Sequence, residues 1–233
     1  MKDNNIGTKL ILSIFDRTGN WARPWIEAGY PVMLWDLKYE GDVLDLKEFG
    51  RWIRGYEQYV HGMLFAPPCT EFSSSGARWW ADKDQNYPER LAKAVELAEM
   101  CHCLATLTEI FPNLKFWALE NPVGRIESCV PELKGLKMLT FDPCDYGDPY
   151  TKKTCLWGKF NANLPKTPVE PEFVEYTGKN GRVTKFAPQF GRTGGTSDKT
   201  KEIRSETPMG FANAFFQANR VKVGNPNQTV LFN

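Results

Sequence analysis

The sequence predicts a Rossmann-like α/β domain with a small loop-rich region near its C-terminal end. Short apolar runs typical of strands buried on both faces recur through the first 160 residues, and stretches with helical spacing separate them. Acidic or other polar residues directly follow several of these runs, as is typical at the carboxyl ends of strands in a parallel sheet. A chain of 233 residues, 42% apolar and 24% charged, can bury one full core.

The first 36 residues predict a β-α-β unit. It consists of a buried strand at residues 9–15, a turn at residues 16–20, a helix at residues 21–28 and a second strand at residues 31–35. Asp36 closes the second strand, about 20 residues after the turn, where an acid commonly binds the hydroxyls of an adenosine ribose. Of the usual glycine pattern the turn retains only Gly19. The unit alone therefore indicates a cofactor site only weakly.

A strand at residues 62–66 leads the chain into Pro67, Pro68 and Cys69. The two prolines have a fixed φ, so they hold the thiol rigidly where the chain leaves the sheet. Residues 73–76 read Ser-Ser-Ser-Gly and predict a mobile loop beside it. A rigidly held thiol next to such a loop is a candidate nucleophile, and a buried cysteine without a chemical role is the alternative.

Residues 46–111 predict two helices and contain a pair of adjacent tryptophans. Helical spacing predicts helices at residues 46–59 and 88–111. Trp79 and Trp80 stand together before a polar stretch at residues 82–87. Adjacent tryptophans either stack on nucleobases or anchor a loop to its own domain, and the sequence leaves both readings open.

A candidate carboxyl group follows the predicted strand at residues 115–119, which runs into Glu120 and Asn121. If this strand lies in the same sheet as the strand before Cys69, Glu120 and Cys69 share one cleft. The remaining predicted elements are strands at residues 138–141 and 155–157, loops with room for a hairpin at residues 161–200, and a helix at residues 208–219.

The charge of the chain is unevenly distributed. Residues 151–233 contain 13 Lys and Arg against 6 Asp and Glu, a balance of +7. Subtracting these from the totals of 29 and 28 leaves 16 against 22, a balance of −6, for residues 1–150. The basic part either binds phosphates or forms a solvated surface, and the charge alone does not decide between them.

Cysteine usage and hydropathy indicate a cytoplasmic protein without a membrane partner. The six cysteines form no C-x-x-C pair and no secreted-type framework, so we expect reduced thiols. Residues 101–103 read Cys-His-Cys inside a predicted helix, where neighbours point in different directions, and we expect no metal site there. No apolar run approaches the ~20 residues that span a bilayer. Residues 1–5 are polar, with no signal-peptide core behind them.

Several stretches, taken in chain order, resemble the motifs of the cytosine-C5 DNA methyltransferases, in a compact form such as phages carry. The similar stretches are residues 15–19 as the cofactor turn, Asp36 with residues 41–43 as adenosine-binding positions, residues 68–73 as the nucleophile motif, Glu120-Asn121 as the target-base motif, and residues 145–149 as the approach to a Gln-x-Arg-x-Arg motif. The resemblance covers residues 9–158 and implies the S-adenosylmethionine-dependent methyltransferase form of the Rossmann-like fold.

The resemblance implies a covalent mechanism. Cys69 would add to cytosine C6, Glu120 would assist as an acid at N3, and Asn121 would hold the Cys69 loop in place. Lys152 or Lys153 would provide the cation that holds cytosine O2 or a phosphate. Because C6 is buried in a duplex, the base would be flipped out, and the serine loop would close behind it.

The resemblance also implies two sets of contacts. S-adenosylmethionine, or a related sulfonium donor, would contact Phe15, Thr18, Gly19, Asn20, Asp36, Asp42, Val43 and Pro68. Nucleic acid would contact Ser73, Ser74, Lys153, Arg192 and Arg204. Arg204 opens an Arg-Ser-Glu-Thr-Pro stretch that is similar to a later motif of the family.

The chain departs from the family pattern at defined places. Arg17 stands where the first glycine of the cofactor turn is usual, so its side chain either points to solvent or constrains the methionine end of the cofactor. Tyr150, Lys152 and Thr154 stand where Gln, Arg and Arg are expected, and a closing Gly-Asn motif is not clear. The target-recognition region has at most about 40 residues, between residues 158 and 200, so sequence readout should be short or relaxed.

We therefore expect S-adenosylmethionine-dependent cytosine-C5 methylation of DNA by a monomer. The expected organisation is a catalytic core at residues 1–158, a small basic target-recognition region at residues 159–203, and a C-terminal helix and tail at residues 204–233 that complete the core. Two alternatives are open: the same chemistry on RNA, as in the tRNA-methylating relatives of the family, and a non-catalytic nucleic-acid-binding module. The recognition sequence and the biological role, whether evading restriction or marking a genome, do not follow from the sequence.

Overall fold

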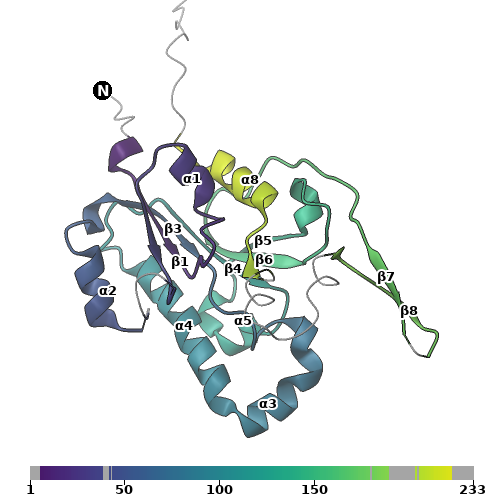
Figure 1. Cartoon of the computed structure of the whole chain (residues 1–233). Coiled ribbons are helices and arrows are strands. Elements are labelled where there is room, and N and C mark those ends of the chain that lie inside the picture. Colours follow the sequence, from purple (N-terminus) through teal and green to yellow (C-terminus); the bar gives the residue numbers. More distant parts are fainter. Residues whose placement is uncertain are drawn as a thin grey trace, which may run out of the picture.

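A six-stranded, mostly parallel sheet forms the centre of the computed structural model (Figure 1). The structure describes residues 6–38, 42, 44–178, 180–188, 203 and 205–221. The strands are β1 (Leu10–Ile14), β2 (Val32–Trp35), β3 (Val60–Phe65), β4 (Phe116–Pro122), β5 (Lys137–Phe141) and β6 (Thr154–Lys159). They run in the order β2-β1-β3-β4-β6-β5, in which β1 to β4 are parallel and β6 is antiparallel to both neighbours.

Helices cover both faces of this sheet. The α-helices are α1 (Arg23–Glu27), α2 (Leu46–Ile53), α3 (Trp80–Asn86), α4 (Pro88–Thr106), α5 (Ile126–Cys129) and α8 (Met209–Asn219). The 3-10 helices are η1 (Ile6–Thr8), η2 (Glu57–Tyr59), η3 (Ser74–Trp79), η4 (Pro131–Leu133) and η5 (Pro143–Tyr146). α2 and α4 pack on one face, and α1 and α8 pack on the other (Figure 1). The result is a three-layer Rossmann-like α/β fold, as the sequence predicts.

The two faces of the sheet bury separate hydrophobic cores. Leu10, Leu12 and Ile14 of β1 face the core under α2 and α4, whereas Ile11 faces the core under α1 and α8. Aromatic rings in mutual contact fill much of the second core, among them Trp21, Trp25, Phe116, Phe211 and Phe215. Two of these rings come from α8, so this helix is part of the core that supports the sheet.

The strands agree with the predictions to within three residues, but the helices differ more. α2 ends at Ile53 rather than at residue 59, because Gly55 has a φ of 85° that a continuing helix does not use. α4 ends at Thr106, whose hydroxyl donates to the His102 carbonyl oxygen at 3.0 Å. The sequence does not predict α3, because its polar residues show no apolar period. Within the described residues, no helix combines the length and apolarity needed to cross a membrane.

A two-stranded hairpin lies outside the main sheet and projects from the body of the molecule (Figure 1). It consists of β7 (Val174–Thr177) and β8 (Val183–Phe186). The chain enters and leaves this region at neighbouring positions: the Glu172 amide donates to the Pro149 carbonyl oxygen at 2.8 Å, and the Gly210 amide donates to Asp148 Oδ2 at 2.8 Å. Both of these ends of the region therefore bond to the same short segment at Asp148 and Pro149.

Candidate functional site

At the carboxyl edge of the sheet β1, β2 and β3 end in one row, and β4 continues past them to Pro122 along β6. The final residues that pair across the strands are Trp35, Ile14, Phe65 and Leu119. The next residues of these strands along the chain are Asp36, Phe15, Ala66 and Glu120. With about 4.8 Å between strands, this row spans about 14 Å from Asp36 to Glu120. The order of the strands reverses between β1 and β3, and ligands of open α/β sheets bind at such a point.

The turn after β1 is buried and has an unusual backbone. Phe15 has a φ of 65°, and no other non-glycine residue of the described chain has a positive φ. Asp16 is 4% exposed, and its Oδ2 accepts hydrogen bonds from Ser13 Oγ and from the Ala22 amide, both at 3.0 Å. Burial raises the pKa of Asp16, and these hydrogen bonds lower it. Asp16 was not among the predicted site residues, and its place directly after a buried strand was the signal for it.

Cys69 lies on the loop after β3, and hydrogen bonds fix this loop on two sides. Asn121 Nδ2 donates to the Pro67 carbonyl oxygen at 3.0 Å in a buried hydrogen bond. The amides of Phe72 and Ser73 donate to the Cys69 carbonyl oxygen at 3.0 and 2.9 Å. The backbone around the thiol is therefore held both by β4 and by its own turn.

Three predicted site residues lie close enough for their charges to interact. Burial raises the pKa of the Cys69 thiol, the positive charge of Lys152 lowers it, and the negative charge of Glu120 raises it. The thiol is consequently not activated by its surroundings alone. Neutralising Glu120 while keeping the charge of Lys152 favours the thiolate, which is the nucleophilic form.

Glu120 is the buried carboxyl group of the site. Glu120 is 8% exposed, and its Oε1 has no hydrogen-bond partner among the described residues. Burial raises the pKa of Glu120, the charge of Lys152 lowers it, and the charge of Asp16 raises it. A buried carboxyl oxygen without a partner is costly unless the group is protonated or meets a ligand. The position therefore suits an acid that contacts a polar ligand.

Lys152 and Lys153 reach the same edge because β6 begins beside the end of β4. Lys152 is half-buried, and its charge lowers the pKa of both the thiol and the carboxyl group described above. Lys153 is exposed, with its ammonium nitrogen 3.9 Å from the Asp142 carboxylate. Of the two lysines, Lys152 is the one that belongs to the candidate catalytic cluster.

The serine-rich stretch is not the free loop that its sequence predicts. Ser73 pairs with Gly124 in an isolated β-bridge, the Ser74 amide donates to the Val123 carbonyl oxygen at 2.9 Å, and η3 begins at Ser74. A side chain at Gly124 would overlap the carbonyl group of Phe72, so glycine is required for this close approach. The stretch is anchored to the end of β4, and closing it behind a flipped base would break these contacts.

A group of residues that the sequence does not predict ties η3 and α3 to the Cys69 loop. Arg125 Nε donates to the Glu71 carbonyl oxygen at 2.9 Å, and the terminal nitrogens of Arg125 make paired hydrogen bonds to the Asp84 carboxylate. Lys83 Nζ donates to Glu71 Oε2 at 3.0 Å. A two-point arginine–carboxylate pair fixes orientation as well as distance. Because Arg125 and Asp84 are 41 residues apart, no local pattern signals their contact.

The predicted cofactor residues lie along the row from the β1 turn to β2. Asp36 is half-buried, and its Oδ1 accepts a hydrogen bond from the Lys38 amide at 2.9 Å. The Asn20 amide donates to Thr18 Oγ1 at 3.4 Å, and Gly19 between them has a φ of 71° that favours glycine. Asp42, farther along the chain, is partly buried, and its Oδ1 accepts from the Leu44 amide at 3.0 Å.

The remaining predicted residues have mixed outcomes. Arg17 is exposed, and its carbonyl oxygen accepts from Lys38 Nζ at 3.4 Å, so it links the β1 turn to the segment after β2. Pro68 is exposed beside the Cys69 loop. Predicted contacts at Val43, Arg192 and Arg204 lie outside the described residues and stay predictions.

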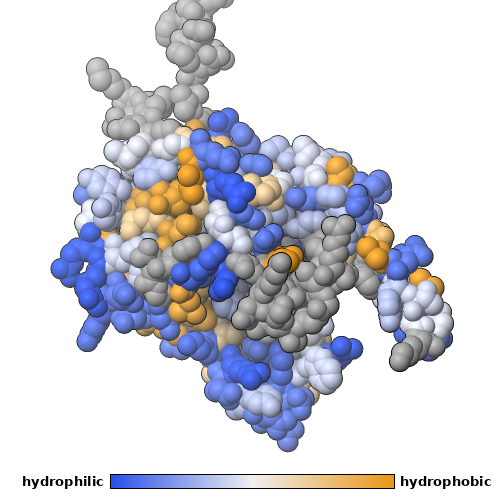
Figure 2. Space-filling model, viewed as in Figure 1, coloured by the Kyte–Doolittle hydropathy of each residue, from blue (hydrophilic) through white to orange (hydrophobic). Residues whose placement is uncertain are grey.

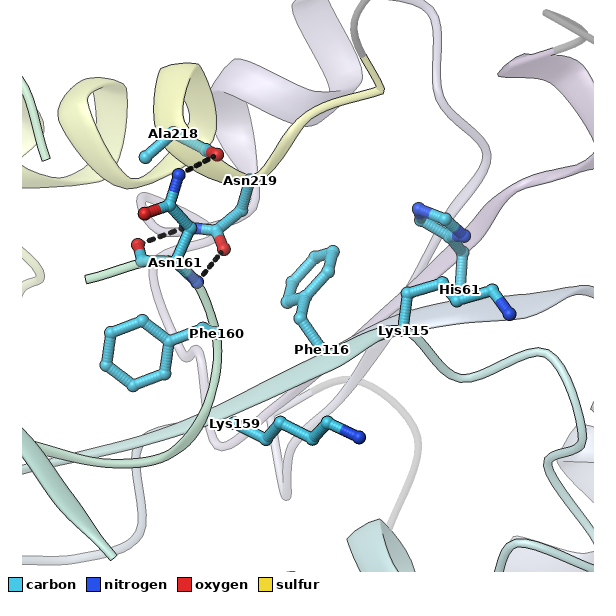
Figure 3. Close-up of a pocket in the computed structure, with 8 residues that line it drawn as sticks. All are labelled: His61, Lys115, Phe116, Lys159, Phe160, Asn161, Ala218 and Asn219. Atoms are coloured by element: carbon cyan, nitrogen blue, oxygen red, sulfur yellow. Dashed lines mark hydrogen bonds between the residues drawn. The ribbon is translucent and has the colours of Figure 1, made fainter. Parts of the chain in front are cut away.

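A separate hollow of about 390 Å³ lies at the opposite edge of the sheet, near the start of β3 and β4 (Figure 3). It is lined by His61, Lys115, Phe116, Lys159, Phe160, Asn161, Ala218 and Asn219. Burial, with the charges of Lys9 and Lys115, lowers the pKa of His61 to about 4. The lining offers no thiol or carboxyl group, so this hollow is not part of the candidate site. Across the described residues, no group of three His, Cys, Asp or Glu side chains is placed to hold a metal ion.

Comparisons with known proteins give distant structural similarity but no sequence match. No family model and no curated protein matches the sequence. The chain is similar to the crystal structure of the Spodoptera frugiperda DNMT2 E260A/E261A/K263A mutant, with 15% identity and a TM-score of 0.34. The match covers 69% of this chain and 53% of that chain, so this chain spans about half the length of the matched protein. Function is therefore inferred from the site residues themselves.

Proposed function

We propose that this chain is an S-adenosylmethionine-dependent cytosine-C5 methyltransferase whose substrate is DNA. The observation that carries the proposal is the cluster at the carboxyl edge of the sheet. There a thiol on a fixed loop, a buried carboxyl group with an unpartnered oxygen and a half-buried lysine interact through their charges. Cytosine C5 is a weak nucleophile, and these three groups supply what its methylation needs.

In the first step Cys69 forms a covalent bond to the base. The thiolate sulfur attacks cytosine C6, the electron pair of the C5–C6 double bond moves toward C5 and the ring, and C5 becomes enamine-like. The Pro67 carbonyl group, held by Asn121, keeps the attacking sulfur on a loop that cannot drift from β4. This rigidity lowers the entropy cost of reaching the attack geometry.

Glu120 meets the charge that develops on the ring. Its raised pKa keeps it protonated closer to neutral pH than an exposed glutamate, so it can donate a proton to N3 as the sulfur adds. The charge of Lys152 acts on both the Cys69 thiol and the Glu120 carboxyl group. Its positive charge stabilises the thiolate before addition, and it can also hold cytosine O2.

The residues at the other end of the row fit the cofactor. S-adenosylmethionine, when bound, supplies the sulfonium methyl group that the activated C5 attacks; a base then removes the C5 proton and the thiolate leaves. Asp36 offers a carboxylate at a strand end, which suits the ribose hydroxyls. Leu37 next to it is 73% exposed, and Figure 2 shows apolar residues gathered between α1 and α2, which suits a flat purine ring.

The choice of DNA as the substrate rests on the sequence resemblance. The same cluster would act equally well on cytosine in RNA, because none of its groups contacts the sugar in the chemical steps. In a duplex the target base would have to leave the stack to reach Cys69. A matched pair of DNA and RNA substrates therefore belongs in the test.

The test uses DNA in which the target cytosine carries fluorine at C5, incubated with the protein and S-adenosylmethionine and followed by intact-mass analysis. Fluorine blocks the loss of the C5 substituent, so we expect a covalent protein–DNA adduct that also carries one transferred methyl group. Cys69→Ser should give no adduct. The matched control is Cys103→Ser, which changes an exposed thiol on α4 and should leave the adduct unchanged.

Other outcomes decide between the alternatives. An adduct with the matching RNA but not with DNA would reassign the substrate. An adduct that persists in Cys69→Ser would remove Cys69 as the nucleophile. No adduct with either nucleic acid, in a protein that binds both, would favour a non-catalytic binding module.

A further inference from the structure

The two adjacent tryptophans have different environments. The Trp80 ring lies under the Arg125 guanidinium at 4.7 Å, and its indole nitrogen is buried. Trp79 is 54% exposed, and its only ring partner among the described residues is the Arg78 guanidinium, 5.1 Å from the ring centroid. Trp80 therefore anchors the segment to the domain, which leaves Trp79 without a structural role of that kind.

Trp79 lies on a segment that is tied to the Cys69 loop. It ends η3, which begins five residues after Cys69, and the helix that follows is tied back to that loop. Lys83 Nζ donates to the Thr70 carbonyl oxygen at 3.3 Å and to Glu71 Oε2 at 3.0 Å. The paired bonds from Arg125 to Asp84 fix the same helix from the side of β4. The exposed ring thus lies on a segment that is tied to the loop of the candidate nucleophile.

The chemistry of this pair fits a nucleobase next to its phosphate. An indole face stacks on any base, and a guanidinium beside it can meet the negative backbone of the same nucleotide. A single exposed aromatic side chain is ordinary on a protein surface, so the pairing of this ring with a guanidinium is the feature that points to a ligand. An acidic peptide would use the cation but would not explain the exposed ring.

We propose that Trp79 and Arg78 form a stacking site for an unpaired base adjacent to the target cytosine in the substrate strand. The position of that base relative to the target rests on the proposed function; the stacking itself does not. The site would hold the strand open while the neighbouring cytosine occupies the cleft of Cys69 and Glu120.

The experiment places 2-aminopurine, whose fluorescence falls when it stacks on an aromatic ring, in an oligothymidylate without cytosine. Affinity is followed by anisotropy of a terminal dye. We expect quenching of 2-aminopurine on binding to the wild-type protein. In Trp79→Ala the quenching should be lost and the affinity should fall about tenfold. Trp79→Phe should restore much of both, which a purely structural effect of the alanine would not explain.

The matched control is Tyr56→Ala, which removes a ring that is 52% exposed near the opposite edge of the sheet. It should leave quenching and affinity at wild-type values. Unchanged quenching and affinity in Trp79→Ala would overturn the stacking site. Because the probe lacks cytosine, quenching that depends on Trp79 alongside no fluorocytosine adduct would refute the proposed function and leave the stacking site standing.

Discussion

The charge of Lys152 lowers the pKa of two groups, the Cys69 thiol and the Glu120 carboxyl group. Its ammonium lowers the pKa of the Cys69 thiol against the effects of burial and of Glu120. We predict that Lys152→Met slows alkylation of Cys69 by iodoacetamide about threefold to tenfold near pH 8, because the thiolate fraction falls as the pKa rises. Peptide mass spectrometry across a pH series measures the rate.

Lys152→Arg keeps the positive charge and should alkylate Cys69 at close to the wild-type rate. Cys103, exposed on α4, provides an internal reference in every sample, and its rate should be the same in all three proteins. If Cys69 reacts equally fast in Lys152→Met and in the wild type, the lysine does not act on the thiol.

The predictable part of the site consists of residues with a local signal. Glu120 and Asp36 each follow an apolar run directly, and Cys69 follows one after two prolines, so their place near the carboxyl edge of the sheet could be predicted from sequence. Asp16 directly follows the predicted strand at residues 9–15, so the same local signal marks it. The contact of Arg125 with Asp84 could not be predicted, because it depends on how two distant segments pack.

The junction between η3 and the end of β4 gives a prediction about stability. Gly124→Ala would force the added methyl group against the carbonyl group of Phe72. We expect the free energy of unfolding to fall by about 1–3 kcal/mol, since the crowded atom is backbone and cannot rotate away. Urea denaturation measures the change.

The control for this change is Gly50→Ala. Gly50 lies in α2, and an added Cβ there meets nothing within 4 Å, so alanine should stabilise the protein by about 0.5–1 kcal/mol through its helix propensity. If the free energy of unfolding falls in Gly124→Ala and rises in Gly50→Ala, the loss is specific to the junction. A neutral Gly124→Ala would mean that the Ser73 bridge shifts without cost.

Element predictions succeeded where an apolar run had a clear end and failed where polar segments fold. The strands were located because buried parallel strands are nearly continuous apolar runs. α3 was missed because its side chains face solvent or make ion pairs, and neither leaves a period in the sequence. The serine stretch looked mobile by composition, yet its backbone pairs with Gly124, a contact 51 residues away that composition does not show.

His61 makes the free energy of unfolding of the protein depend on pH. Its pKa of about 4 in the folded state lies below the usual value of 6.5, because burial and the charges of Lys9 and Lys115 oppose protonation. The unfolded chain therefore binds a proton that the folded chain does not. Stability from this group is fully present above pH 6.5 and is lost as the pH falls toward 4.

After allowance for solvent screening of a half-buried group, the loss is about 1–2 kcal/mol. Urea denaturation at pH 7 and at pH 4.5 should show this loss in the wild type and in His102→Gln, which changes the second of the two histidines. Between pH 7 and pH 4.5 the free energy of unfolding of His61→Gln should fall by about 1–2 kcal/mol less than that of the wild type. Equal losses in His61→Gln and the wild type would mean that the imidazole titrates normally.

The base of the hairpin region has a consequence for how such a protein can diversify. The segment between Glu172 and Gly210 leaves and rejoins the core at Pro149 and Asp148, so its two ends already lie together. Lengthening a segment whose ends are fixed costs little, about 0.6 kcal/mol for each doubling of length. Insertions between these two ends should therefore cost the fold little, because the loop that carries Cys69, the strand that carries Glu120 and the segment that carries Lys152 lie outside them.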